Sequence, residues 1–153
     1  MSSSIKKNID KIPINHEILV ALGDSIFSAA LILAEKVNTE QIYVDYLNKY
    51  SKVSDLYKNK AINERNRLAY ATASELNSIE SYNLFISKYP NAMQADNAWK
   101  NIYDLAYENC LKQNSIESYK GFITTYPNAS QVEIANLKIH ELAFEAAEKA
   151  NTI

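Results

Sequence analysis

The side chains best suited to chemistry are few and widely separated in this 153-residue chain. His16 and His140 are the two histidines, Cys110 is the single cysteine, and no H-x-x-x-H pair or cysteine cluster accompanies them. A structural zinc site needs about four such ligands at close spacing, so we expect no metal site. Cys110 has no partner for an internal disulfide. We expect it to be a small packing residue, and His140 to be a partly buried helix residue.

Carboxylates are the remaining candidates for acid–base chemistry. Glu141, Glu145 and Glu148 share one face of the last predicted helix. A general acid would need an apolar pocket to raise its pKa, and nothing in the sequence marks one, so a solvated stripe that pairs with Lys138 or Lys149 is expected. Nucleophile motifs, phosphate-binding glycine loops and dinucleotide fingerprints are also missing from the sequence. The chain is therefore predicted to be no enzyme and to hold no cofactor.

The composition favours a helical protein with a real core. Hydrophobic residues make up 47% and charged residues 22%, and there are only two glycines for the turns of a many-stranded sheet. The net charge of −2 gives no electrostatic case for nucleic acid. The most apolar stretch, 18–34, contains Asp24 and falls short of the roughly 20 apolar residues of a membrane span, so a buried helix is expected there and no direct membrane insertion.

An internal repeat organises the chain. The hexapeptide NSIESY at 77–82 recurs letter for letter at 114–119, and YPNA at 89–92 recurs at 126–129. Two weaker copies lie upstream. In one of them Asn38, Tyr43 and Tyr50 occupy matching positions, and before it Ile9, Pro13 and Ala30 match more loosely. The sequence therefore predicts a single repeat domain over 1–153, with units at 1–37, 38–76, 77–113 and 114–150. The closing Asn-Thr-Ile at 151–153 resembles the opening of each later unit. Either a further unit begins there and is cut off, which we expect, or the repeat array decays at this point.

Each unit is predicted to contain two helices. In the third unit, apolar residues spaced by three and four predict helices over 78–89 and about 92–112, with a break at Pro90. Asn114 and Ser115 offer side-chain oxygens to cap the next helix in place of a glycine turn. The predicted inward residues of the second helix are Ala95, Ala98, Trp99, Ile102, Tyr103, Ala106 and Cys110.

Two recurring positions indicate how the units pack. Tyr43, Tyr82 and Tyr119 share one position, which we expect to face the core. Alanine recurs at another position, where neighbouring helices are expected to cross closely: Ala30, Ala69, Ala106 and Ala143. This pattern predicts that each hairpin buries its apolar face mainly against the next hairpin.

These residues resemble the tetratricopeptide-repeat (TPR) family, in the variant with Y-P-N helix ends found in bacterial tandem arrays and similar to TPR lipoproteins of outer-membrane assembly. Trp99 and Ile102 match the first pair of the motif, and Tyr119 and Pro127 match later positions. Tyr103 departs from it, since a small residue is usual there, and the period is 37 rather than 34. The resemblance implies an all-α fold, a right-handed α-solenoid of about four TPR-like hairpins and about eight helices. It favours a bacterial periplasm or outer membrane, with the cytoplasm next.

The resemblance also implies a concave groove lined by one helix of each motif. Carried over to this sequence, the groove runs from basic to acidic, with aromatic rings along its floor. Two competing interpretations stay open. Tyr70 and Tyr107 could instead pack between hairpins, and the basic residues could instead form a solvated helix face. The implied residues are Lys60, Asn63, Arg67, Tyr70, Asn97, Lys100, Asp104, Tyr107, Glu108, Glu141, Phe144 and Glu145.

The expected function is a non-catalytic protein–protein interaction scaffold that binds a peptide or a partner helix. A structural spacer or assembly segment of a larger cell-envelope protein is the alternative, and an accessory region of an enzyme is a third hypothesis. Uncapped repeat ends would also allow the chain to self-associate.

Overall fold

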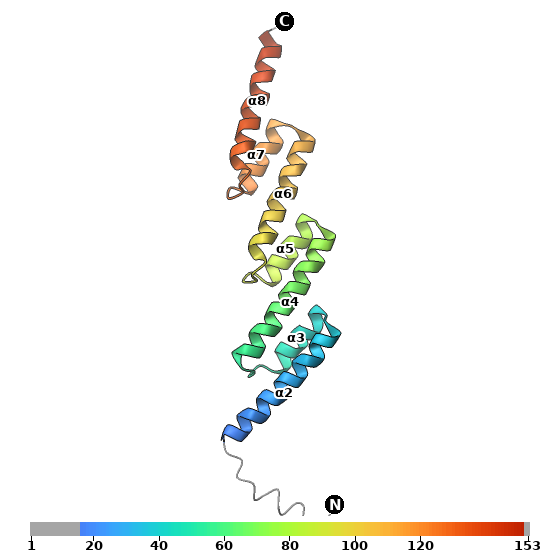
Figure 1. Ribbon diagram of the computed structural model, residues 1–153. Helices are drawn as coiled ribbons and strands as arrows, with labels where there is room; N and C mark the ends of the chain where they lie inside the picture. Colours follow the sequence, from blue (N-terminus) through green and yellow to red (C-terminus); the bar gives the residue numbers. More distant parts are fainter. Residues whose placement is uncertain (1–15, 152–153) are drawn as a thin grey trace, which may run out of the picture. The chain divides into compact units, whose positions relative to one another are not determined.

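The computed structural model describes residues 16–151, and their side chains from residue 20 onward (Figure 1). Within this range the fold is entirely helical, which confirms the predicted all-α class. The second helix expected in unit 1–37 is present, whereas the first would fall largely within residues 1–15, outside the described residues. The helices are α2 (His16–Val37), α3 (Glu40–Lys49), α4 (Asp55–Leu76), α5 (Ile79–Lys88), α6 (Ala95–Gln113), α7 (Ile116–Thr125) and α8 (Val132–Asn151).

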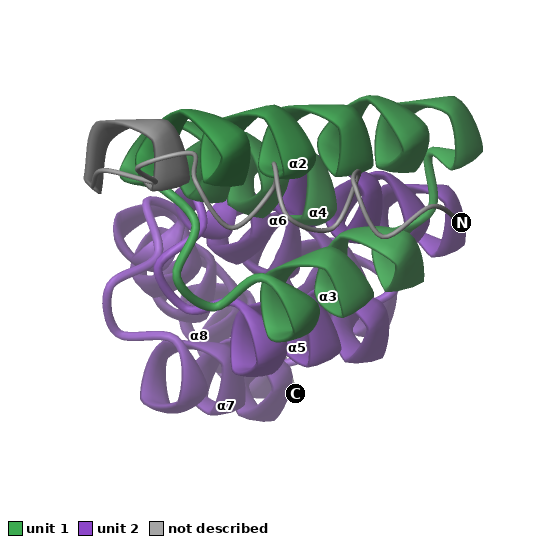
Figure 2. Ribbon diagram, turned by 90° about the horizontal axis from the view of Figure 1, so that it is seen from below, with its two compact units in different colours: residues 1–65 green, residues 66–153 purple. Residues whose placement is uncertain are grey.

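The chain divides into two compact units, Met1–Arg65 and Asn66–Ile153, coloured separately in Figure 2. The described part of unit 1 contains α2, α3 and the first half of α4. Unit 2 contains the rest of α4 and α5 to α8. The division therefore falls inside a long helix, not at a repeat boundary, and we describe each unit by itself.

A repeated asparagine follows the long helices α2, α4 and α6. Asn38, Asn77 and Asn114 have φ angles of 52°, 43° and 44°, the left-handed conformation that glycine usually supplies after a helix. Asparagine tolerates this conformation better than other non-glycine residues. The hydroxyl of Tyr119 donates to Oδ1 of Asn114 at 3.3 Å, and Tyr82 donates to Asn77 at 3.1 Å. The junction thus needs no glycine, although Asn114 acts at the end of α6 and not, as predicted, as a cap of α7.

Serine begins the short helices of unit 2. The Ser115 side chain accepts a hydrogen bond from the Ser118 amide at 3.1 Å, and the Ser115 amide donates to Oγ of Ser118 at 3.3 Å. Ser78 and Ser81 form the same reciprocal capping box before α5. Such a box satisfies two amides that a helix start leaves without partners. The predicted capping role of Ser115 is confirmed.

The start of α6 differs from the sequence-based prediction. The helix begins at Ala95 rather than near residue 92. After Pro90 the chain forms short turns, in which the Ala92 amide donates to the Tyr89 carbonyl and the Ala95 amide donates to the Ala92 carbonyl, both at 3.0 Å. These turns place Ala92 in the core, where it is buried. Helical spacing alone does not separate such turns from a first helical turn.

The core of unit 2 consists of aromatic side chains from short helices set against small or aliphatic residues of long helices. Tyr82 and Phe85 of α5 pack with Ala98 and Ile102 of α6. A second cluster repeats this arrangement with α7 and α8, and Tyr119 in it is fully buried. Tyr43 of unit 1 is also buried. The prediction that the recurring tyrosines face the core is confirmed.

Three side chains lie elsewhere than predicted. Trp99 is 39% exposed and stacks on Tyr103, with ring centroids 5.9 Å apart, so it is a surface residue. His140 is exposed and not partly buried. Ala143 is exposed, unlike Ala69 and Ala106 at the same repeat position, because no described helix lies across it.

Candidate protein-binding surfaces

The residues implied by the TPR resemblance lie on α4, α6 and α8 and divide between the two units. Lys60 and Asn63 belong to unit 1, and the others belong to unit 2. We therefore consider the residues of each unit by themselves and describe no single groove that contains all of them. In unit 2 the side chains of Asn97, Lys100 and Glu108 are exposed on α6. Arg67 on α4 and Glu145 on α8 are exposed as well.

Tyr70 and Tyr107 are half-buried, and each packs against an aromatic ring of the next short helix. The Tyr70 ring lies 5.4 Å from Phe85, and its hydroxyl accepts a hydrogen bond from Asn101 at 3.1 Å. The Tyr107 ring lies 5.5 Å from Phe122, and burial raises the pKa of its hydroxyl. Both rings therefore take part in packing within unit 2, the role that competes with binding a partner.

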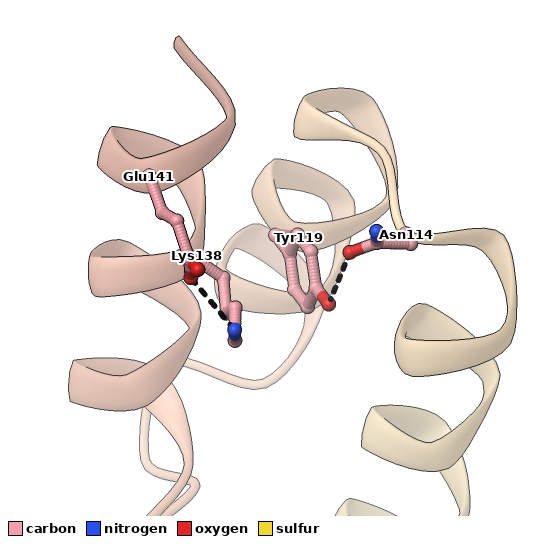
Figure 3. Close-up of polar contacts among 4 residues, drawn as sticks. All are labelled: Asn114, Tyr119, Lys138 and Glu141. Carbon is pink, nitrogen blue, oxygen red and sulfur yellow. Dashed lines mark hydrogen bonds and ion pairs between the residues drawn. The ribbon is translucent and has the colours of Figure 1, made fainter. Parts of the chain in front are cut away.

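Several of the implied charged residues already have partners. Lys60 lies 2.6 Å from Glu35 within unit 1, and this hydrogen bond raises the pKa of Lys60. Asp104 accepts a hydrogen bond from Gln131. Glu141 accepts one from Lys138 at 2.6 Å, which raises the pKa of Lys138 and confirms the predicted pairing (Figure 3). The two lysine–glutamate pairs lie at the surface, where ion pairs add little stability.

A different surface, the groove between α2 and α3 in unit 1, has the chemistry of a binding site. It encloses about 320 Å³. Ala30 and Ala34 leave room on its α2 side, and Leu33 and Val37 stand beside them, 62% and 58% exposed. The remaining lining residues come from α3 and its C-terminus: Ile42, Asp45, Tyr46, Lys49 and Tyr50.

The polar groups of this groove stand at its edge. Oδ1 of Asp45 accepts a hydrogen bond from Gln41 at 2.8 Å, and the Lys49 ammonium lies 5.4 Å from the centroid of the Tyr50 ring. The Tyr46 hydroxyl donates to the Phe27 carbonyl at 3.1 Å, and burial raises its pKa. The groove therefore offers apolar walls with one acidic and one basic side chain beside them.

The same repeat positions form a second groove, between α6 and α7. This groove encloses about 270 Å³ and keeps a floor of small residues, Ala106 and Cys110. Its walls differ in chemistry. Asn109, Gln113 and Ser118 occupy the positions that Leu33, Val37 and Ile42 have between α2 and α3. The aliphatic residues at the Leu33 and Ile42 positions are thus particular to the α2–α3 groove, because both later repeats have polar residues there.

Sequence reasoning missed this groove because it assigned the stretch 18–34 to a buried helix. In the described part of α2, large apolar side chains are instead exposed, among them Leu22, Ile26 and Leu33. The available signal was the repeat itself. Aligning the repeats shows Leu33 where Thr72 and Asn109 stand later in the chain, and Ile42 where Ser81 and Ser118 stand, whereas Val37 matches Leu76 and then Gln113.

The remaining candidates for chemistry are the single cysteine and any cluster of metal-binding side chains. Cys110 is buried, as predicted, and burial raises the pKa of its thiol. No three histidine, cysteine or carboxylate side chains within the described range come together as metal ligands. None of the described helices combines the length and the apolar character needed to cross a bilayer.

Comparison with known proteins gives no relative. No family model matches the chain, and neither a curated protein nor a solved structure matches it.

Proposed function

We propose that the chain is a non-catalytic interaction scaffold, a right-handed array of TPR-like hairpins, in which the α2–α3 groove binds an apolar segment of a partner protein. One observation carries this proposal. Leu33 and Val37 are largely exposed above a groove with a small-residue floor, whereas the equivalent walls between α6 and α7 are polar. Contiguous exposed apolar surface of this kind is typical of interaction sites.

The groove can supply useful binding energy. Burying the exposed parts of two aliphatic side chains is worth on the order of 3 kcal/mol. Asp45 and Lys49, four residues apart on α3, add charges of opposite sign at the edge. Charges in such positions affect the orientation and association rate of a partner more than its affinity. We expect the bound segment to be apolar where it meets Leu33 and Val37, with complementary charges beside α3.

The proposal is tested with a variant in which Leu33 and Val37 are replaced by the residue types found at the equivalent positions of the α6–α7 groove. Peptides of about 15 residues are selected from a displayed library against the unmodified chain, and their affinities are measured for the double variant Leu33→Asn/Val37→Gln. We expect selected peptides to lose affinity by roughly tenfold or more, the scale of one buried aliphatic contact. The unfolding midpoint should stay unchanged, because both side chains are already exposed.

Leu137→Asn is the matched control, because Leu137 is 68% exposed on α8 in unit 2 and does not line the groove. It should bind the selected peptides as the unmodified chain does. Peptides that bind the double variant as tightly as the original would contradict the proposed groove. Failure to select any peptide would favour the alternative function, a structural spacer.

A further inference from the structure

Unit 2 shows twice how the end of a long helix is covered. Ala69 and Ala73 of α4 are buried under α5, where Oγ of Ser81 donates to the Ala73 carbonyl at 2.9 Å. The rings of Tyr82 and Phe85 lie 6.2 and 5.4 Å from the Tyr70 ring. The covering helix thus contributes one serine and two aromatic rings.

The end of α6 repeats this arrangement under α7. Ala106 and Cys110 are buried, and Sγ of Cys110 donates to the Ser118 carbonyl at 3.3 Å. The Tyr107 ring lies 6.2 Å from Tyr119 and 5.5 Å from Phe122. Small residues on the long helix let the next helix approach closely, and the aromatic residue between them packs on two incoming rings.

The corresponding face of α8 is uncovered. Ala143 and Ala147, which match Ala69 and Ala73, are both exposed. Phe144, which matches Tyr70 and Tyr107, is 64% exposed. Among the residues that the structure describes, no helix packs on these three side chains, which we call the α8 end face.

We propose that the α8 end face is a docking surface for a two-helix hairpin of the same pattern carried by a partner protein. The first helix of that hairpin presents Ser-Tyr-x-x-Phe, as α5 and α7 do. Its aromatic rings fill the space above Ala143 and Ala147 and pack against Phe144. The corresponding aromatic residues of α3, α5 and α7 are all buried, so the occupant comes from outside the described residues. The α8 end face shares no residue with the α2–α3 groove, and its test is independent of the proposed function.

The test supplies a hairpin of known sequence at high local concentration. A second copy of residues 77–113 is joined to the C-terminus of the full chain through a flexible glycine–serine linker, which makes docking intramolecular. We expect amides near Ala143 and Ala147 to exchange with solvent roughly tenfold more slowly in the linked chain than in the unlinked chain. Replacing both aromatic residues in the added copy, Tyr82→Ser and Phe85→Ser, should abolish this protection.

Two alanine variants locate the contact. Ala143→Glu should remove the protection in the linked chain, and it should leave the unlinked chain with an unchanged unfolding midpoint because Ala143 is exposed there. Ala146→Glu is the matched control. Ala146 occupies the position of Thr72 and Asn109, which stay exposed when a hairpin is docked, so protection should persist. Equal protection in both variants, or no added protection in the linked chain, would overturn the proposal.

Discussion

At the scale of single residues, Cys110 contributes to core packing and also makes the free energy of unfolding depend on pH. Its side chain is buried, and its Sγ donates to the Ser118 carbonyl of the next helix. Burial is the main cause of the raised pKa of the thiol, because it disfavours the charged thiolate. A buried thiol with a raised pKa is a poor nucleophile, which agrees with the structural role of this side chain.

This pKa shift predicts a pH dependence of stability. Below the ordinary thiol pKa, about 8.5, both the folded and the unfolded chain keep the proton, so the contribution is fully present. Above it the unfolded chain ionises first, and the free energy of unfolding falls as the pH rises through the raised folded pKa. Denaturant unfolding of the unmodified chain and of Cys110→Ala at pH 7 and pH 10 measures this effect.

Alanine is the matched substitution because Ala73 has the equivalent position in α4. At pH 7 we expect Cys110→Ala to lower the free energy of unfolding by about 1 kcal/mol, through lost packing and the lost contact with Ser118. At pH 10 the difference should shrink, because the variant has no thiol to ionise. A difference that does not change with pH would show that thiol burial makes no contribution.

At the scale of elements, the junction between a long helix and the next short helix depends on asparagine. Asn114 holds a φ of 44° at the end of α6, while its side chain accepts a hydrogen bond from Tyr119 at the centre of α7. One residue therefore sets the backbone turn and anchors a buried ring (Figure 3). The same pairing of Asn77 with Tyr82 joins α4 to α5.

Two substitutions at Asn114 separate these contributions. Asn114→Gly keeps the left-handed conformation and loses only the acceptor for Tyr119, so we expect a loss of about 1 kcal/mol in the free energy of unfolding. Asn114→Ala also places a side chain with no local hydrogen bond in the left-handed region, so its loss should be about 2 kcal/mol. Asn128→Ala, in the exposed turn before α8, is the control and should change stability by less than about 0.5 kcal/mol. Equal losses for glycine and alanine would contradict the conformational role of Asn114.

At the scale of the whole molecule, each unit is held by contacts between neighbouring helices. In unit 2, α6 is packed on both sides, since α5 and α7 each contact it. No described helix packs on the C-terminal part of α8, where every described side chain from residue 143 onward is exposed. Where each helix packs mainly on its neighbours, the free energy of unfolding is a sum of local contributions, so we expect stability to vary along the chain.

Hydrogen exchange measures this variation. We expect amides around Ala98 and Ile102, whose side chains are fully buried, to exchange slowest in unit 2. Amides at 145–151 should exchange several orders of magnitude faster, because opening the end of α8 exposes almost no apolar surface. The first half of α8, near buried Ala135, provides the comparison within one helix. Uniform exchange along α8 would show that some other contact holds its end.

Much of the fold could be predicted from local chemistry. The repeat, the helical class, the inward tyrosines and the serine caps depend on spacing and on side chains within a few positions of one another. The start of α6 was misplaced because the turns after Pro90 have nearly helical spacing. The candidate site was not predicted, since an aliphatic residue such as Leu33 has the same appearance in a sequence whether or not a helix covers it.

The sequence alone determined which segments are helices, where most of them begin and end, and which positions are equivalent between units. Periodicity and capping are short-range effects, so they can be read from neighbouring residues. Only the tertiary structure decided which apolar residues stay uncovered: Leu33 and Val37 beside the α2–α3 groove, Trp99 on α6, and Ala143 and Phe144 on α8. Exposure is a property of what lies across from a side chain, and that is settled by packing between helices distant in sequence.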